Sequence, residues 1–408
     1  MNTLSATCAS VLFLATAAAG AVLADSYWIE FAAHPSDGID GDFYGTAAAL
    51  ASGSAVIGAF GDDGHRGAAY VLRKSGDEWN EVQKLVADDG APNEEFGYDA
   101  AITHDLIAVS AWNATVGANA FQGAVYLFQN QGGSWTQTQK LVADDGGLFD
   151  NFGQSVAIDA TRIVVGANGA TIGDQGAQGA AYIFDRDGSA WVQQQKIWSD
   201  DGDTVDNFGN AVAMRGSTLF VGALQAMADG NANQGAVYVF TDDGSGTWTQ
   251  VQKLTSSDGG GGDAFGASVS FDGTTLVVGA TYAGGQGAAY VFENTGGSWS
   301  EVQKLVADDA AANDYFGNAV SLSGDNILVA ADGKTVDGFG SRGAAYLFSR
   351  VGDTWVQSHR FVASDGGTDN FYGASAALDG NTAVLTSAQR NTAYFYARDT
   401  LFADGFEG

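Results

Sequence analysis

The chain has 408 residues, with 58 glycines, two prolines, one cysteine and a formal net charge of −31 at pH 7. Abundant glycine suits many tight turns between strands, and the scarcity of proline argues against a collagen-like or proline-rich protein. The negative charge argues against nucleic acid and anionic membranes as partners, because both carry charge of the same sign.

The N-terminal segment is expected to be a secretory signal peptide. Residues 1–24 contain no charged side chain, and the apolar run 11–23 ends in Ala24, which is typical of export signals. No other stretch approaches the roughly 20 apolar residues that spanning a bilayer requires. Cys8 lies within the segment, so the mature protein is expected to lack thiols and disulfides. We therefore expect a secreted or cell-surface protein without membrane insertion.

A Phe-Gly or Phe-Tyr-Gly signature recurs seven times at steps of 51 to 57 residues. The signature glycines are Gly45, Gly97, Gly153, Gly209, Gly266, Gly317 and Gly373. A period near 50 is typical of propeller blades or of a repeat array. Within the third unit, residues 152–197, four short apolar runs alternate with turn residues, which predicts four strands, here called A to D.

Two of the three connections within a unit have nearly constant length. The interval from the signature glycine to the end of strand B is always 13 residues, and the interval from the strand C tyrosine to the strand D tryptophan is nine or ten. Between strand B and that tyrosine the interval ranges from 8 to 16. Variation is therefore expected in the B–C loops, the connections on which binding sites are usually built.

The two ends of the repeat region complement each other. The seventh unit ends at Tyr396 without its tryptophan strand, and the segment 28–33 has the pattern of that missing strand D. Pairing the two would close the ring and leave no open edge. The sequence thus predicts an all-β, seven-bladed β-propeller of four-stranded antiparallel blades over residues 25–398, followed by an acidic-aromatic tail at 399–408.

The repeated elements Phe-Gly, Val-Gly-Ala, Gly-Ala-Ala-Tyr-Val-Phe and Trp-x-x-x-Gln-Lys-Leu resemble FG-GAP repeats over about residues 27–396. Such repeats form the blades of the integrin α-subunit head and occur in many bacterial surface proteins, so the resemblance implies a propeller with a binding role, for example in adhesion. Integrin-type repeats carry an Asp-rich calcium loop between strands A and B. Here the A–B connections, such as 159–162, are too short for that ligand set, and those metal sites are not expected.

Several recurring residues have a structural interpretation. One Phe, one Tyr and one Trp per unit are expected to fill the wedge between neighbouring sheets. A lysine recurs at one position of the outer strand D, where it is expected to protect the sheet edge from aggregation. These lysines are Lys84, Lys140, Lys196, Lys253 and Lys304.

The D–A loops carry a repeated acidic pattern with two readings. In two of these loops the residues are Asp144, Asp145 and Asp150, and Asp200, Asp201 and Asp206. Aspartate oxygens in glycine-containing loops can bind Ca²⁺, and they can equally cap turns by accepting backbone N–H bonds. Capping is the favoured interpretation. No cofactor is required on this view, and calcium is an optional ligand.

The B–C loops present apolar residues that are candidates for binding a protein or a polysaccharide. They are Trp112, Phe121, Ile172, Leu224, Met227, Tyr282 and Phe339. The alternative is that these side chains fold back onto neighbouring blades.

The chain is not expected to be an enzyme, since its four histidines lack metal-ligand spacing and no nucleophile elbow occurs. Two alternatives stay open. One is a polysaccharide-acting hydrolase that uses carboxylates such as Asp229, Asp332 and Asp337; the other is a purely structural envelope or matrix protein.

Overall fold

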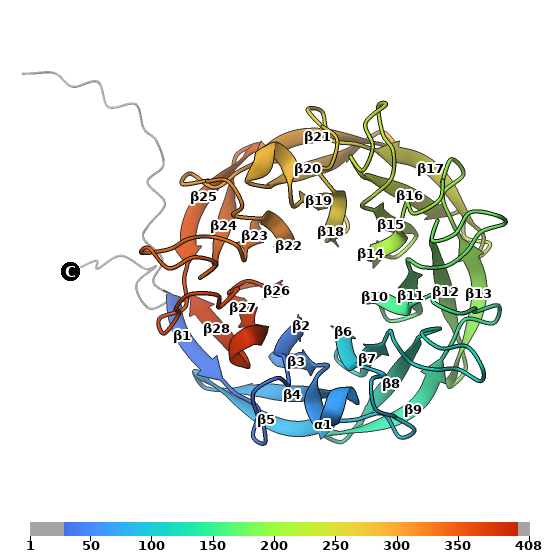
Figure 1. The fold of residues 1–408 in the computed structure, drawn as a ribbon, viewed down its shortest axis with the longest axis horizontal. Coiled ribbons are helices and arrows are strands. Elements are labelled where there is room, and N and C mark those ends of the chain that lie inside the picture. The colour runs from blue at the N-terminus through green and yellow to red at the C-terminus, as the bar shows by residue number, and fades with distance from the viewer. Residues whose placement is uncertain (1–27, 399–408) are drawn as a thin grey trace, which may run out of the picture.

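The computed structural model describes residues 28–398. These residues form a ring of seven four-stranded antiparallel sheets around a central axis (Figure 1). The predicted seven-bladed propeller is therefore confirmed. The signal peptide predicted at 1–24 and the tail predicted at 399–408 lie outside the described residues.

Each blade contributes strands A to D from the axis outward, and a B–C loop can contain a short helix. Blades 1 to 3 consist of β2 (Tyr44–Ala51), β3 (Ser54–Ala59), β4 (Ala68–Ser75) and β5 (Glu78–Leu85); β6 (Phe96–Ile102), β7 (Leu106–Ala111), β8 (Ala124–Gln131) and β9 (Ser134–Leu141); and β10 (Phe152–Ile158), β11 (Arg162–Ala167), β12 (Ala180–Asp187) and β13 (Ala190–Ile197). Blades 4 and 5 consist of β14 (Phe208–Arg215), β15 (Thr218–Ala223), β16 (Ala236–Asp242) and β17 (Trp248–Leu254); and β18 (Phe265–Phe271), β19 (Thr275–Ala280), β20 (Ala288–Thr295) and β21 (Ser298–Leu305). Blades 6 and 7 consist of β22 (Phe316–Ser323), β23 (Asn326–Ala331), β24 (Ala344–Val351) and β25 (Thr354–Phe361); and β26 (Ala376–Asp379), β27 (Thr382–Ser387), β28 (Thr392–Arg398) and β1 (Trp28–Ala33). The short helices are α1 (Asp62–His65), η1 (Ala283–Gly285) and η2 (Ala388–Arg390).

The first described strand completes the last blade, as predicted. β1 pairs antiparallel with β28, from Trp28 opposite Arg398 to Ala33 opposite Ala393. The blade order β26-β27-β28-β1 thus joins the two ends of the repeat region in one sheet. Backbone hydrogen bonds between residues more than 350 positions apart hold the ring closed.

The repeated aromatics fill the wedges between blades, which confirms the structural interpretation. Tyr182 is fully buried, Phe152 likewise, and Trp191 is 7% exposed. They share one apolar cluster with Val125 and Leu127 of the preceding blade. In blade 1 the buried place of the signature phenylalanine is taken by tyrosine: Tyr44 is buried, and Phe43 beside it is only partly buried.

The signature glycines allow neighbouring inner strands to meet. Gly209 has φ +92°, and a Cβ there would lie 2.3 Å from the backbone oxygen of Ala180. The previous blade meets it with Gly166, whose Cβ would lie 1.9 Å from the oxygen of Gly209. This close approach explains why small residues recur 13 positions after each signature glycine. At the ring closure the facing residue is Thr386, whose hydroxyl donates to the Gly45 oxygen at 2.6 Å.

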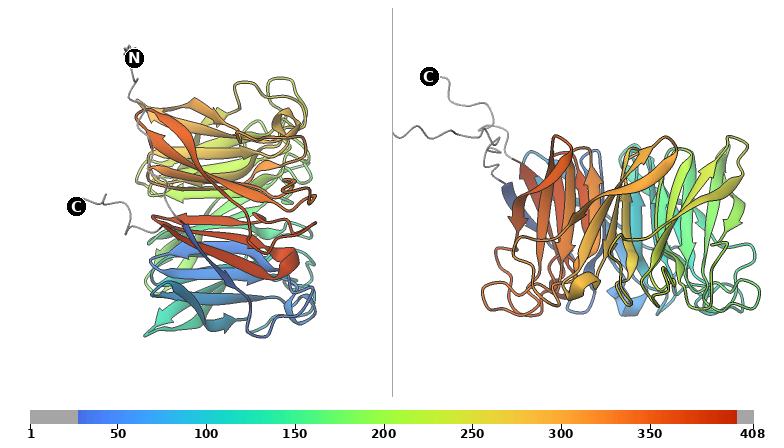
Figure 2. Two further views of the ribbon diagram at one scale, coloured as in Figure 1. Left: turned by 90° about the vertical axis from the view of Figure 1, so that its left-hand side faces the viewer. Right: turned by 90° about the horizontal axis from the view of Figure 1, so that it is seen from above.

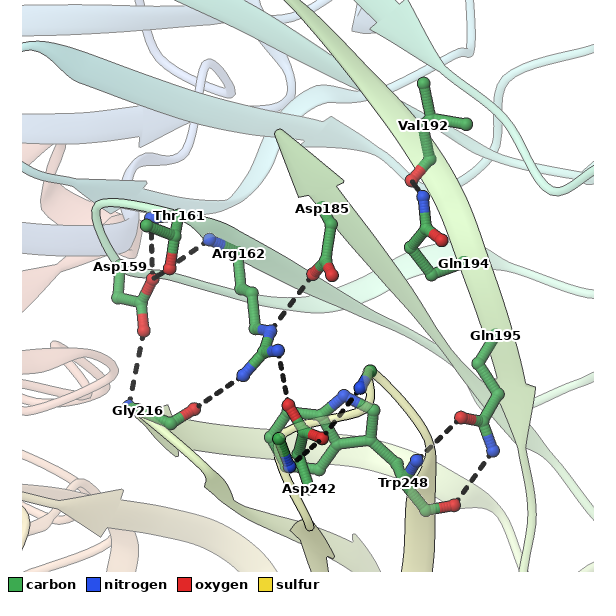
Figure 3. A network of polar contacts seen from close by, with 12 residues as sticks. Asp159, Thr161, Arg162, Asp185, Val192, Gln194, Gln195, Gly216, Asp242 and Trp248 are labelled. Atoms are coloured by element: carbon green, nitrogen blue, oxygen red, sulfur yellow. Dashed lines mark hydrogen bonds and ion pairs between the residues drawn. The ribbon is translucent and has the colours of Figure 1, made fainter. Parts of the chain in front are cut away.

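A side-chain amide links the outer strands of successive blades. Oε1 of Gln195 accepts the Trp248 N–H at 2.8 Å, and its Nε2 donates to the Trp248 carbonyl at 2.9 Å (Figure 3). The same pairs are Gln83 with Trp135, Gln139 with Trp191, Gln252 with Trp299, and Gln303 with Trp355. β1 has Ala32 at this position, so blade 7 joins blade 1 without this contact.

The two kinds of connection lie on opposite faces of the disc. Because the strands are antiparallel, the A–B and C–D turns share one face, and the B–C and D–A loops share the other; the longer loops gather on one side when the disc is seen edge-on (Figure 2). Within residues 28–398, no helix is long and apolar enough to cross a membrane.

Candidate functional site

The B–C and D–A loops form one continuous surface, here called the loop face. The N–H of Phe149 in a D–A loop donates to Ala120 of the preceding B–C loop at 3.1 Å, and the Asn151 N–H donates to Phe121 at 3.0 Å. Equivalent bonds run from Val205 to Gly176 and from Asn207 to Ala177. In blades 1 to 6 the B–C loop therefore supports the next D–A loop by backbone bonds, which leaves the loop side chains free to vary.

One aspartate of each D–A loop anchors that loop to the outer strands of the following blade. Asp145 accepts the Tyr182 hydroxyl at 3.0 Å and pairs with the Lys196 ammonium group at 2.7 Å, while that group lies 5.3 Å from the Tyr182 ring centre. Asp201 pairs with Lys253 at 2.7 Å. The same ion pair joins Lys84 to Asp37, Lys140 to Asp89 and Lys304 to Asp258. The recurring lysines thus anchor the loops, a role that the sequence analysis did not assign to them, and edge protection stays a prediction.

The remaining predicted metal residues have other surroundings. Asp150 accepts the Gly147 N–H at 2.7 Å, and Asp206 accepts the Asp203 N–H at 2.8 Å, which is the geometry of a turn cap. The backbone N–H groups of Asp144 and Asp200 donate to strand D glutamines of the following blades, Gln193 and Gln250. Residues 28–398 contain no group of three or more Asp, Glu, His or Cys side chains arranged to hold a metal ion. Calcium binding at these loops stays a prediction.

The loop anchors predict a stability loss in acid. Burial alone would raise the pKa of Asp145, but the hydrogen bond and charge of Lys196 outweigh it, so the pKa lies below its ordinary value. Stabilisation by this group is therefore complete above the unfolded pKa of about 4 and is lost as the pH falls through the lower folded pKa. Five further loop aspartates have lowered pKa values in the same way: Asp37, Asp89, Asp201, Asp258 and Asp309.

We expect Asp145→Asn to destabilise the protein at pH 6 and to lose that difference by about pH 2.5, measured by urea unfolding across this range. Asp187→Asn, at an exposed end of β12, is the matched control, for which no such convergence is expected. A difference between wild type and Asp145→Asn that stays constant with pH would contradict the proposed ionic anchor.

The structure separates the seven predicted apolar loop residues into two groups. Phe121, Met227, Tyr282 and Phe339 are exposed, Met227 to 59% and Tyr282 to 54%. Ile172 packs against the core between blades 2 and 3, as the alternative of folding back predicted. Trp112 and Leu224 are partly buried, and each directly follows a strand B. These seven side chains are spread around the face and do not form one cluster.

Sequence reasoning missed an aromatic partner of Phe121. The Phe149 ring, 55% exposed in the D–A loop after β9, stacks on Phe121 with ring centres 5.2 Å apart and an interplanar angle of 12°. Leu148 beside it is also 55% exposed. Leu148 and Phe149 lie at least 27 positions after Phe121 in the sequence. The three side chains come together only because the B–C loop pairs with the following D–A loop.

Large exposed apolar side chains are unequally distributed in the described residues. They lie on the loop face or on the outer strands, and none lies on an A–B or C–D turn. Those on the loop face include Ile39, Val205 and Trp198 in D–A loops. Those on outer strands include Val192 and Val251. The two faces of the disc therefore differ in chemistry.

The opposite face is held together by polar contacts. Arg162, at the start of β11, donates through Nε to Asp185 at 3.0 Å and through Nη2 to Asp242 of blade 4 (Figure 3). Its guanidinium also lies 5.1 Å from the Trp248 ring centre. These contacts join blades 3 and 4 beneath their turns, which is a structural role.

A cavity of about 420 Å³ opens on the loop face above blade 1. Its walls are the loop before β2, the helix α1 and the loop after β5. Lys84 links two of these walls, at 2.7 Å from Asp37 and 2.8 Å from Asp62. The cavity is thus lined largely by charged groups that already pair with one another.

The three carboxylates considered for a hydrolase do not share one loop. Asp229 lies in the B–C loop of blade 4 and accepts Nε2 of Gln234 at 3.3 Å. Asp332 and Asp337 lie in the B–C loop of blade 6, two blades further on, where Asp337 pairs with Arg342 at 2.8 Å. Burial raises the pKa of Asp332 to about 6. The described contacts bring together no acid and base pair from this set.

Comparison with protein families agrees with the geometry. The model of the FG-GAP repeat matches residues 32–72, 79–128, 135–184, 191–240, 248–292 and 299–348. Most matched segments run from strand D of one blade to strand C of the next, so the sequence repeat is offset from the blade by one strand. A search of curated proteins gives no match. Since these segments cover most of the chain and the structure is the propeller that such repeats form, the protein belongs to the FG-GAP repeat family.

Proposed function

We propose that this chain is an exported binding protein that engages a protein or polysaccharide through its loop face, in adhesion at a cell surface. FG-GAP repeats are typical of extracellular and surface proteins, and propellers of this family are generally not catalytic. The proposal requires no cofactor and leaves calcium as an optional ligand. The alternative of a polysaccharide-acting hydrolase is not favoured, because the described contacts bring together no pair of the carboxylates named for it.

The exposed pair Phe121 and Phe149 is the observation that carries the proposal. Both residues have left-handed backbone, with φ +56° and φ +65°, a conformation that costs a bulky residue roughly 1–2 kcal/mol. Some other blades have asparagine, which suits that conformation better, at the equivalent positions, whereas Val205 occupies the Phe149 position before blade 4. Asn233 takes the place of Phe121 in blade 4, and Asn93 and Asn313 take the place of Phe149 before blades 2 and 6.

The aromatic pair does not serve the ring contacts. The apolar cluster between blades 2 and 3 includes neither Phe121 nor Phe149. Two bulky side chains are thus kept at strained, exposed positions, where asparagine would serve the fold. Strain of this kind is characteristic of functional sites, and stacked aromatic rings at a surface are characteristic anchors for a ligand.

Substituting both positions tests the proposal. We expect Phe121→Asn with Phe149→Asn to abolish capture on a panel of immobilised extracellular proteins and insoluble polysaccharides. We also expect the free energy of unfolding to change by less than about 1 kcal/mol, because relief of backbone strain offsets the lost ring contact.

Val251→Thr, an exposed apolar residue of outer strand β17, is the matched control and should keep capture. Capture by the double variant at the wild-type level would contradict the proposed face. Capture lost equally in Val251→Thr would point to the rim of the disc.

A further inference from the structure

A second set of aromatic residues lies along part of the inner margin of the loop face, beside the inner strands of blades 1 and 2. Phe43 stacks on Phe60 with ring centres 4.8 Å apart, and Phe60 lies 6.4 Å from Tyr98. Tyr98 in turn stacks on Trp112 at 4.6 Å and an interplanar angle of 28°. All four are partly exposed. They form a continuous arc of rings, here called the aromatic arc.

The aromatic arc is not part of the repeated blade core. The signature positions of blades 1 and 2 are filled by Tyr44 and Phe96, which are both buried. Phe43 has left-handed backbone, φ +55°, and blades 3 and 4 have Asn151 and Asn207 at that position. The propeller can therefore be built without aromatic rings at this margin, as two neighbouring blades demonstrate.

Polar side chains hold the arc and extend it. The Trp112 indole N–H donates to Glu95 at 2.7 Å, which fixes the plane of the ring. Nε2 of Gln154, from the inner strand of blade 3, lies 3.4 Å from the Tyr98 hydroxyl. Beyond it, Nδ2 of Asn207 donates to the Asn168 carbonyl at 3.3 Å. Going from blade 1 to blade 4, the margin thus changes from ring faces to uncharged amides.

These two chemistries together match a sugar chain. The C–H bonds of a pyranose ring are attracted to the negative face of an aromatic ring, and amide groups both donate to and accept from sugar hydroxyls. The carboxylate of Glu95 accepts the Trp112 indole N–H and keeps its negative charge, so it adds to the repulsion of anionic ligands. The net charge of −31 repels anionic polymers.

We propose that the aromatic arc and the adjoining amides form a binding site for an uncharged polysaccharide. This inference rests on the proposed function, because it places one ligand class at one part of the loop face. Tyr98 and Trp112 form the stacking platform, and Gln154 is the nearest amide to it.

Affinity electrophoresis of the mature chain tests the proposal. The gels contain laminarin, xyloglucan, galactomannan or dextran as uncharged probes, alginate as an anionic probe and chitosan oligosaccharide as a cationic probe. We expect retardation by at least one uncharged polymer, at least a tenfold weaker affinity in Trp112→Ala, and a smaller loss in Trp112→Phe. Gln154→Ala should also weaken binding, and it provides a readout if Trp112→Ala unfolds. Circular dichroism confirms the fold of each variant.

The outcomes separate this inference from the proposed function. Retardation only by alginate or chitosan, or an unchanged affinity in Trp112→Ala and Gln154→Ala, would overturn the polysaccharide site. If uncharged polymers bind and only the Phe121 and Phe149 double variant loses them, the binding face stands and the aromatic arc does not. If no protein or polysaccharide probe binds, both proposals fail.

Discussion

Replacing Trp135 with alanine is expected to lower the free energy of unfolding by about 3–5 kcal/mol. The Trp135 side chain is 4% exposed and belongs to the apolar cluster that joins blade 1 to blade 2. Its removal leaves a cavity between two neighbouring sheets. The other contacts of the closed ring hold these sheets in place, so they cannot move together to fill the cavity. Chemical denaturation followed by circular dichroism measures the loss.

Trp135→Phe is the matched control for this prediction. Within the described residues the indole N–H of Trp135 has no hydrogen-bond partner, so phenylalanine keeps most of the apolar surface and loses no polar contact. The backbone of residue 135 is held by Gln83 in either variant. We expect a loss of less than about 2 kcal/mol for Trp135→Phe. Equal losses in the two variants, or a loss below 1 kcal/mol in Trp135→Ala, would contradict the packing described.

Removing strand β1 is expected to have the second large effect. A chain that begins at residue 34 lacks all of β1, which leaves the β28 edge of blade 7 without its partner. It also loses the Trp28 ring, which lies 5.2 Å from Phe361 of blade 6. We expect its melting temperature to fall by more than 10 °C relative to a chain that begins at residue 25, and we expect it to aggregate through the open edge.

A peptide of residues 25–33 supplied in trans tests the same contact from the other side. If β1 acts by completing blade 7, the peptide should bind the shortened chain and restore part of the melting temperature in a concentration-dependent way. The same peptide with Phe31→Asp is the control, since Phe31 packs against the cluster that joins blade 7 to blade 1. A shortened chain that melts like the longer one would show that ring closure does not depend on β1.

The fold could be predicted because every repeat carries the residues that a blade needs at the same spacing. Strand lengths, the signature glycine and the buried aromatics recur at fixed spacing, and the intervals at the two ends of the repeat region predict the shared blade. The 13-residue interval from Gly153 to Gly166 has a simple cause in the structure: the inner strands of successive blades approach too closely for a large side chain.

The roles of individual polar residues were harder to predict. The ion pair between Lys196 and Asp145 could not be predicted, because the two residues lie 51 positions apart and only the propeller brings them together. The sequence therefore pointed only to edge protection for Lys196. The same limit applies to Phe121 and Phe149, which meet through the pairing of two loops.

The aromatic arc was missed for a different reason. Phe43 belongs to the Phe-Tyr-Gly signature of blade 1. Tyr44 occupies the buried position, however, and Phe43 is partly exposed at the inner margin of the loop face. Its left-handed backbone is set by the turn into strand A, which side-chain spacing does not reveal. Comparing equivalent positions in different blades would have revealed the aromatic arc, whereas the spacing within one unit does not.

The loop face is proposed to be the surface that binds ligands. The most direct measurement is oxidative footprinting by mass spectrometry, comparing the free protein with the protein saturated by a ligand from the capture panel. We predict reduced oxidation of Phe121, Phe149 and Met227 in the complex and unchanged oxidation of His104, an exposed A–B turn residue on the opposite face. Protection of His104 with unchanged oxidation of the loop residues would contradict the account.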